Sequence, residues 1–349
     1  MRYKPPVTAT DVTGLTMADL EGLLSSRRRA IEAAKWIYGN RAWSPDLPTT
    51  LAGVNGEAWG RLRASCAVPE VRVTDRSIAS DGTTKFLIEM PGGSVETVLI
   101  PARDRSTVCV SSQIGCTRSC QFCATATLGF TRSLRAGEIV AQYLVARAHG
   151  AERPELSPAT NVVFMGMGEP MDNLDEVLTA VEILTQTPAP QLGNAQVTVS
   201  TSGIVPGMRR FLAESKASLA LSLNGSTDAQ RTRVMPHNKT WPIAELVAVL
   251  REHPKRTHFI EYVMFDDVND SDEDAARVAE LLTGINARLN LIPHNPISSP
   301  TALRSSSAGR IEAFHRVTHA AGLRTMIRWP KGQDVAAACG QLARIRTKG

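Results

Sequence analysis

The 349-residue sequence predicts an α/β fold built on a parallel sheet. Beyond residue 106, short apolar runs rich in β-branched residues recur, and each is followed by a stretch whose apolar residues have helical spacing. Six such strand–helix pairs follow one another, a pattern that is typical of βαβ units. Because eight units are needed to close a barrel, we expect a partial, open barrel of the (β/α)6 type.

The bulk composition narrows the class of protein. With 43% apolar and 21% charged residues, the chain has the composition of an ordinary globular protein. No apolar run is long enough to span a membrane, the start of the chain has no signal-peptide pattern, and the cysteines are clustered rather than spread as a disulfide framework. These features predict a cytoplasmic protein without a membrane partner. The net charge of +5 favours polyanionic partners, although many basic proteins bind no nucleic acid.

The N-terminal segment, residues 1–68, is expected to form a small helical domain. Apolar residues recur at helical spacing over 17–38, and Arg27, Arg28 and Arg29 fall on another face of that helix. A run of charges of this kind is usually a solvated face. It becomes a phosphate-binding surface only if the function of the protein calls for one.

Three further segments follow. Residues 69–101 contain three short strand patterns broken by Ser-Asp-Gly and Pro-Gly-Gly, which predicts a small β linker. Residues 102–336 carry the partial barrel, and residues 337–349 form a C-terminal segment that carries Cys339. The barrel strands are expected at 107–111, 161–165, 196–201, 219–223, 259–264, 288–292 and 323–328, and its helices at 136–149, 174–184, 206–216, 243–252, 273–282 and 310–320.

The loop after the first barrel strand carries the most specific motif of the chain. Cys116, Cys120 and Cys123 have the spacing C-x3-C-x2-C, and Cys109 precedes them. Structural zinc would need a fourth ligand, and no second Cys or His knuckle follows at a suitable distance. Three thiolates can instead hold a [4Fe–4S] cluster and leave its fourth iron open, whereas the plain alternative is three cysteines that merely pack. The spacing resembles that of the radical S-adenosylmethionine (SAM) superfamily.

The ends of the other predicted strands carry glycine, serine and amide side chains. In β/α barrels the active site lies at the carboxyl ends of the strands, so these segments would share one rim with the cysteines. Glycines after the second strand would let the backbone approach a ligand closely, and the Glu169 carboxylate would suit an ammonium group. Each segment alone is a weak signal. The segments are 164–170, 200–203, 222–224 and 293–296.

Several longer motifs resemble the RlmN/Cfr family of radical SAM RNA methyltransferases, and their residues are more similar to those of RlmN than to those of Cfr. They are Cys-Val-Ser-Ser-Gln-Ile-Gly-Cys, Met-Gly-Met-Gly-Glu-Pro, Val-Ser-Thr-Ser-Gly-Ile-Val-Pro, Glu-Tyr-Val-Met, Val-Asn-Asp and Asp-Val-Ala-Ala-Ala-Cys-Gly-Gln-Leu. The resemblance implies methylation of carbon 2 of an adenosine in 23S rRNA, with tRNA as a second substrate. That carbon is electron-poor and does not attack the methyl group of SAM, so radical chemistry supplied by a cofactor is needed.

The resemblance also implies roles for single residues. Cys116, Cys120 and Cys123 would hold the [4Fe–4S] cluster. Cys339 would be methylated by one SAM, and its S-methyl group, turned into a methylene radical with the help of a second SAM, would add to the base. Cys109 would resolve the covalent adduct by forming a transient disulfide with Cys339, and Glu96 would be the proton acceptor. The SAM contacts would be Gly168, Glu169, Ser200, Ser222, Leu223, Asn224 and Asn295.

One position departs from the family pattern, because Asn224 stands where the family usually has His. The remaining implied partners are a one-electron donor such as flavodoxin and a thiol reductant for the disulfide, and we expect a monomer. A Cfr-like enzyme that methylates carbon 8 is an alternative in the same class. A non-catalytic, metal-binding RNA-binding protein is the alternative in a different class, and it predicts tetrahedral zinc and no SAM cleavage.

Overall fold

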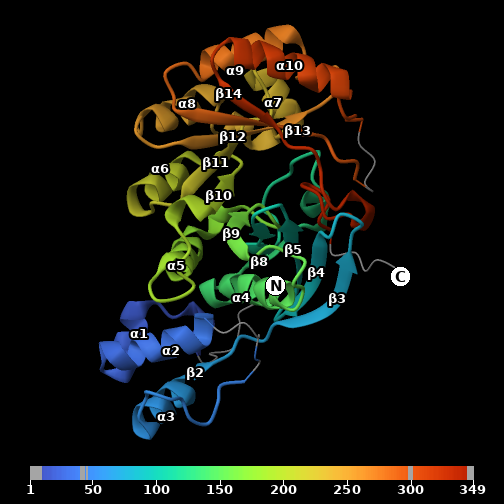
Figure 1. The fold of residues 1–349 in the computed structure, drawn as a ribbon. Coiled ribbons are helices and arrows are strands. Elements are labelled where there is room, and N and C mark those ends of the chain that lie inside the picture. Colours follow the sequence, from blue (N-terminus) through green and yellow to red (C-terminus); the bar gives the residue numbers. More distant parts are fainter. Residues whose placement is uncertain (1–9, 40–43, 45, 298–301, 344–349) are drawn as a thin grey trace.

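A ten-stranded sheet runs through the protein in the order β14-β13-β12-β11-β10-β9-β6-β5-β4-β3 (Figure 1). The structure, a computed structural model, describes residues 10–39, 44, 46–297 and 302–343. Neighbouring strands from β6 to β14 are parallel, and those from β3 to β6 are antiparallel. The parallel strands are β6 (Ser106–Cys109), β9 (Ala159–Phe164), β10 (Val197–Thr201), β11 (Ser218–Ser222), β12 (His258–Met264), β13 (Ala287–Pro293) and β14 (Arg324–Ile327).

A helix follows each of the first six parallel strands, which confirms the predicted α/β class. Strands β11 and β12 are mostly apolar and mostly buried, as expected for parallel strands that are covered on both faces. The helices are α4 (Ala136–Ala151), α5 (Leu174–Thr185), α6 (Val205–Glu214), α8 (Ile243–Arg251), α9 (Asp272–Leu281) and α10 (Ala308–Ala320), with the short α7 (Asp228–Val234) between β11 and α8. Within the described residues the strand pairing leaves the sheet open, with β14 and β3 as its edges.

The three strands predicted as a β linker extend this same sheet. They are β3 (Arg72–Ile78), β4 (Thr84–Met90) and β5 (Gly93–Pro101). Gly92 turns the chain between β4 and β5 with φ of +88°, a conformation that glycine adopts without strain. Because β5 pairs with β6, side chains of the antiparallel strands face the same interior as those of the parallel strands.

The N-terminal part contains two helices where the sequence predicted one over 17–38. Helix α1 (Met17–Leu24) ends at Ser25, whose φ of +49° is left-handed, and α2 (Arg27–Gly39) starts two residues later. The prediction was wrong because a left-handed residue breaks a helix without disturbing the apolar spacing on either side. Helix α3 (Gly56–Ser65) completes the group, which Figure 1 shows at one end of the molecule. The short strands β1 (Thr10–Asp11) and β2 (Cys66–Ala67) pair beside it.

The chain after β14 crosses to the opposite edge of the sheet. In Figure 1 this C-terminal segment lies beside β4. The Ser80 amide, between β3 and β4, donates to the Asp334 carboxylate at 2.9 Å, and the Gly332 amide donates to Asp81 at 3.1 Å. The segment therefore bridges the two edges of the open sheet.

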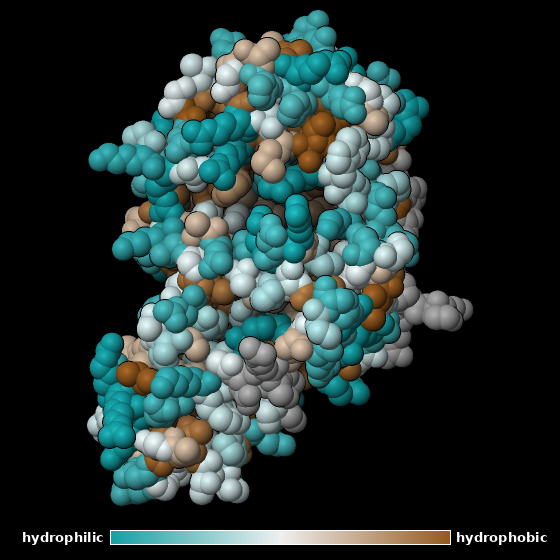
Figure 2. Space-filling view, viewed as in Figure 1, coloured by the Kyte–Doolittle hydropathy of each residue, from teal (hydrophilic) through white to brown (hydrophobic). Residues whose placement is uncertain are grey.

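Short elements complete the fold. They are β7 (Gln113–Gly115), β8 (Phe130–Ser133), η1 (Val12–Gly14), η2 (Ala124–Leu128), η3 (Pro170–Asn173), η4 (Asn194–Gln196), η5 (Pro236–Lys239) and η6 (Gln333–Val335). Figure 2 shows that the face seen in Figure 1 is mostly hydrophilic, with apolar residues in small separate groups. Among the helices that the structure describes, none is long and apolar enough to cross a lipid bilayer.

Candidate active site

The three cysteines predicted to bind iron lie in residues 113–130, which we call the cluster loop. Its ends form the short β7–β8 hairpin, and the Cys116 amide donates to the Gly129 carbonyl at 3.0 Å. Gly115, just before, has φ of +80°, and a Cβ there would lie 1.8 Å from the Gly129 oxygen. Only glycine fits this position, so the backbone itself fixes where the first cysteine stands.

The three thiols lie close enough to affect one another's ionisation. Burial raises the pKa of Cys116 to about 12 and that of Cys120 well above its usual range, and the neighbouring Cys123 adds to both shifts. No three His, Cys, Asp or Glu side chains among the described residues are arranged so that they could hold a single metal ion. A four-iron cluster needs a different arrangement of ligands, because each cysteine binds a different iron. Three neighbouring thiols fit this arrangement.

Cys109 and Cys339, which are far apart in the sequence, are brought together. Cys109 is buried at the end of β6, and its pKa is raised above the usual range by burial and by the nearby Cys339. Cys339 is reachable by solvent, although protein surrounds it on most sides. This environment raises its pKa to about 11, and Glu261 and Cys123 contribute. Both cysteines are free thiols in this structure.

Residues 332–343, which we call the Cys339 loop, are held by polar contacts from several other elements. Gly332 at its start has φ of +63°, and a Cβ there would lie 2.7 Å from Thr83. Ala336 also has a left-handed φ, +49°, although it is not glycine. Four hydrogen bonds help to hold the loop. The Gly332 amide donates to Asp81, and the carbonyls of Cys339, Gly340 and Leu342 accept from Asn295, Ala124 and Thr125.

Asn295, predicted as a SAM contact, binds the Cys339 loop with both ends of its amide. Its Nδ2 donates to the Cys339 carbonyl at 3.1 Å, and its Oδ1 accepts from the side-chain Nε2 of Gln333 at 3.0 Å. The structure thus gives Asn295 a clear role in placing Cys339, the residue predicted to carry the methyl group. A contact with SAM stays a prediction for this residue.

Glu96, predicted as the proton acceptor, is fully buried on β5 instead of facing solvent as strand glutamates commonly do. Its Oε1 lies 3.0 Å from the Nζ of Lys85, and its Oε2 accepts from the Ala343 amide at 2.7 Å. The Ser111 hydroxyl donates to its backbone carbonyl at 2.7 Å. Glu96 therefore stands beside the Cys339 loop.

The glycines after β9 serve the packing of the protein itself. A Cβ at Gly166 would lie 2.7 Å from the Ser111 hydroxyl, and one at Gly168 would lie 2.6 Å from the Gln113 side chain. These neighbours belong to the segment that follows β6, and a contact of Gly168 with SAM stays a prediction. Close approach of two backbone segments explains both positions.

Glu169 is buried, and it is held by Ser202 just after β10 and by Met171 in η3. Its carboxylate accepts from the amide and hydroxyl of Ser202, at 2.8 and 2.7 Å, and from the Met171 amide at 3.1 Å. Burial raises the pKa of its carboxyl. Because Glu169 also raises the pKa of Cys116 and Cys120, its carboxyl lies in the neighbourhood of the cluster loop.

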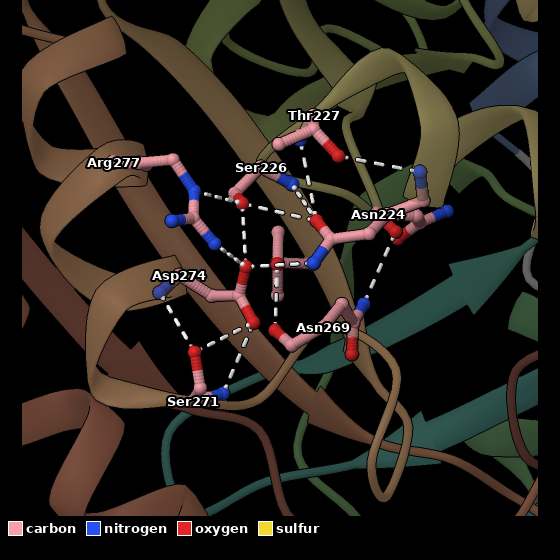
Figure 3. A network of polar contacts seen from close by, with 9 residues as sticks. Asn224, Ser226, Thr227, Asn269, Ser271, Asp274 and Arg277 are labelled. Atoms are coloured by element: carbon pink, nitrogen blue, oxygen red, sulfur yellow. Dashed lines mark hydrogen bonds and ion pairs between the residues drawn. The ribbon is translucent and has the colours of Figure 1, made fainter.

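Asn224 links the segment after β11 to β12, and Figure 3 shows it at one side of a larger network of polar contacts. Its φ of +52° is left-handed, a conformation that Asn tolerates better than most residues. Its Oδ1 accepts from the Val263 amide at 2.8 Å, and its Nδ2 donates to the Met235 sulfur at 3.2 Å. Asn269 donates to its carbonyl at 3.1 Å. This side chain is thus used within the protein, and its contact with SAM stays a prediction.

Ser200, Ser222 and Leu223 lie at the carboxyl ends of the adjacent strands β10 and β11, as predicted. The two serines are half-buried and Leu223 is buried. The sequence interpretation missed Arg231, which is fully buried behind them. It donates to the carbonyls of Leu223 at 3.0 Å and Ser222 at 3.2 Å, and burial lowers its pKa to about 10. No local pattern marks this arginine, because it lies on α7 and its partners are backbone carbonyls at the end of β11.

Glu261 on β12 was also missed. Burial raises its pKa to about 7, and the Asn290 amide donates to it at 2.8 Å. Its charge in turn raises the pKa of Cys339, so it belongs to the same site. A signal existed in the sequence, because a carboxylate in the middle of an apolar strand is rarely buried without a purpose.

The site and fold together define a radical SAM enzyme. The model of the radical SAM superfamily matches residues 110–279, which include the cluster loop. A crystal structure of a radical SAM methyltransferase from Sphaerobacter thermophilus has a TM-score of 0.88 and 36% identity, and the match covers 96% of this chain and 100% of that one. Enzymes of this superfamily use a [4Fe–4S] cluster and SAM, and these are the cofactors of this chain.

Sequence comparison gives the family within that class. The dual-specificity RNA methyltransferase RlmN of Dinoroseobacter shibae is 45% identical over 98% of this chain and 91% of that protein. The protein of the same name from Paracoccus denitrificans is 38% identical over 100% of this chain and 93% of that protein. The chain belongs to the RlmN family of radical SAM methyltransferases. The non-catalytic alternative is therefore wrong.

Proposed function

We propose that this enzyme methylates carbon 2 of an adenosine in 23S rRNA, through a methyl group carried on Cys339. The observation that carries the proposal is the docking of the Cys339 loop on the cluster loop, where the Ala124 amide donates to the Gly340 carbonyl at 2.7 Å, with Cys339 near enough to raise the pKa of Cys109. The relatives named dual-specificity RNA methyltransferase support RNA as the substrate. We propose tRNA as a second substrate. With these substrates the enzyme acts in the cytoplasm.

The residues divide the work between holding the cofactors and handling the methyl group. Cys116, Cys120 and Cys123 hold the cluster. When bound, the cluster and SAM supply the methyl group and the one-electron chemistry that an electron-poor carbon needs. Cys339 carries the methyl group on its sulfur, and Asn295 fixes the backbone at that residue.

Release of the product needs a base and a second thiol. In the covalent adduct, the methylene carbon on the Cys339 sulfur is bonded to carbon 2 of the adenine. Because this adduct forms by radical addition, it has one unpaired electron, which would return to the cluster that Cys116, Cys120 and Cys123 hold. Glu96 accepts the proton from carbon 2. The Cys109 thiolate then attacks the Cys339 sulfur, so that the S–S bond forms and the C–S bond breaks. The electron pair goes to the departing methylene carbon, which takes up a proton to become the methyl group, and a thiol reductant restores the two thiols.

RNA must bring an unstacked base to this site. The N-terminal helices supply a candidate grip on the RNA backbone, since Arg27 and Arg28 at the start of α2 are exposed. Arg29 donates instead to the Leu24 carbonyl at 3.3 Å. The electron donor in this proposal is a one-electron carrier such as flavodoxin, and the enzyme acts as a monomer.

An anaerobic reaction tests the proposal. The protein is reconstituted with iron and sulfide and mixed with SAM, a reductant and unmodified 23S rRNA or tRNA, and the RNA is digested for nucleoside mass spectrometry. We expect 2-methyladenosine, and we expect it to disappear in Cys339→Ala. Formation of 8-methyladenosine would move the enzyme to Cfr-like chemistry. SAM cleavage without either product would show that the RNA substrate is wrong.

A further inference from the structure

Lys85 and Glu96 form a buried ion pair on the two antiparallel strands β4 and β5. Lys85 is 4% exposed and Glu96 is fully buried, and Nζ lies 3.0 Å from Oε1. Lys85 is paired in register with Val98, so Glu96 is its diagonal neighbour on the same face. Lysine is almost never buried without a partner, and a buried ion pair is by itself weak support for stability. The pair therefore calls for a further explanation.

Both members of the pair also contact the backbone of the Cys339 loop. The Lys85 Nζ donates to the Ala336 carbonyl at 3.3 Å, three residues before Cys339. The Ala343 amide, four residues after Cys339, donates to the Glu96 Oε2 at 2.7 Å. The ion pair thus holds the loop on both sides of the reactive thiol.

The backbone of the loop is strained where Lys85 contacts it. Ala336 has φ of +49°, a left-handed conformation in which a Cβ is crowded by the backbone. Such conformations persist only where the surroundings impose them, and they gather at functional sites. The Lys85 ammonium donates a hydrogen bond to the carbonyl of this strained residue.

We propose that Lys85 is a positioning residue for methyl transfer, which holds the Glu96 carboxylate and the backbone of the Cys339 loop in one fixed arrangement. The proton acceptor and the methyl carrier then reach the substrate base in a set geometry. This inference rests on the proposed function, in which Glu96 takes the proton from the adduct. Lys85 touches neither the substrate base nor a cofactor in this scheme and acts through Glu96 and the loop.

Amide hydrogen exchange on the full-length, cluster-loaded protein tests the coupling without RNA. In Lys85→Met the side chain keeps its length but loses its charge. We expect exchange over residues 336–343 to become about tenfold faster, because contacts of a charged group on the loop are lost. The matched control is Lys331→Met, since the Lys331 Nζ donates to the Pro101 carbonyl just outside the loop. Exchange over 336–343 should change less than about twofold in this control.

A double-mutant cycle separates positioning from general packing. If Lys85 acts through Glu96, the effect of Lys85→Met on exchange should be smaller in a Glu96→Gln background than in the wild-type protein. Additive effects would overturn the proposal, as would unchanged exchange in a folded Lys85→Met protein. If Lys85→Met alone does not fold, the double variant, which removes both charges, is compared with the wild type. Unchanged exchange over 336–343 in that variant would also overturn the proposal.

Activity gives the second readout. In the RNA methylation assay, Lys85→Met should lower kcat about tenfold and leave the KM for SAM unchanged, because Lys85 holds the base and the carrier. A raised KM for SAM with an unchanged kcat would overturn the positioning role. If exchange responds as expected but no RNA is methylated by the wild-type enzyme, the proposed function is wrong while the coupling of Lys85 to the loop stands.

Discussion

The cluster loop and the Cys339 loop bring cysteines to the same place, but they are held in different ways. The cluster loop is closed by its own backbone, through the β7–β8 pairing and the bond from Cys116 to Gly129. The Cys339 loop contains only a short η6 turn, and it depends on side chains such as Asn295, Lys85 and Thr125 from other parts of the chain.

This difference suits the two tasks in the proposed reaction. Ligands of a cluster have to stay in place through every turnover, and a backbone hairpin with a required glycine gives that rigidity. A methyl carrier has to receive its group and then present it to a base. A loop held by a handful of side-chain contacts can open locally without unfolding of the sheet that surrounds it.

The largest effect is expected in the cluster loop itself. Cys120→Ser replaces a thiolate ligand with a hydroxyl, which is a much poorer ligand for the irons of a cluster. We expect the protein to lose its iron and RNA methylation to fall by more than about a thousandfold. Iron analysis and nucleoside mass spectrometry check this. Cys66→Ser is the control, because Cys66 is buried near the N-terminal helices, and it should keep its iron. Full activity of Cys120→Ser would show that the cluster is not bound by this loop.

The rigidity of the hairpin can be broken at Gly115. A Cβ there would overlap the Gly129 oxygen, and the left-handed φ adds strain. We expect Gly115→Ala to lower the free energy of unfolding by about 3 kcal/mol or more, measured by urea denaturation. Gly60→Ala on α3 is the control, because no atom lies within 4 Å of its new Cβ and alanine favours a helix. Equal stability of the two variants would mean that the hairpin adapts to the methyl group.

The sequence predicts the parallel sheet well because its signals are local. Strand β12 was expected at 259–264 and lies at His258–Met264, since an apolar run bounded by polar residues marks a buried strand. The cysteine motif is local as well, because its spacing alone suggests the cluster. The break at Ser25 left no such trace, so two helices were predicted as one.

The contacts that hold the Cys339 loop could not be predicted in this way. Lys85 and Glu96 are diagonal neighbours on two strands, and Asn295 meets Cys339 only after the sheet has formed. Nothing near Asn295 in the sequence shows that its amide binds a loop at the other end of the domain. The resemblance to a family gave Glu96 and Asn295 their predicted roles, but it did not include Lys85.

A buried carboxyl makes the stability of the region around Cys339 depend on pH. The pKa of Glu261 is about 7 in the folded protein, above its usual value of about 4.3 in an unfolded chain. Its contribution to stability is therefore complete below about pH 4 and is lost as the pH rises through 7, by about 3 to 4 kcal/mol in all. Glu261→Gln keeps an acceptor for Asn290 and should remove this loss. Urea denaturation of both proteins at pH 5 and pH 8 measures the difference.

The control for this pH effect is Glu280→Gln, which changes an exposed carboxyl on α9. It should leave the difference between the two pH values as it is in the wild-type protein. If Glu261→Gln shows the same difference in stability between pH 5 and pH 8 as this control, the carboxyl of Glu261 does not cause the pH dependence. The region around Cys339 would then have no pH-dependent stability from this residue.

The smallest effect is expected when one contact of the Cys339 loop is removed. Asn295→Ala deletes the bonds to the Cys339 carbonyl and the Gln333 amide, and each neutral hydrogen bond contributes about 1 kcal/mol. Without SAM present, the Cys339 thiol should then react with a maleimide about five- to tenfold faster, because the loop opens more often. The iron content should not change, since the cluster loop is closed by its own backbone. Asn286→Ala, which removes a side-chain bond to Thr257 elsewhere, should alter neither value. Loss of iron from Asn295→Ala would show that the two loops are held as one unit, and the contrast between them would then fail.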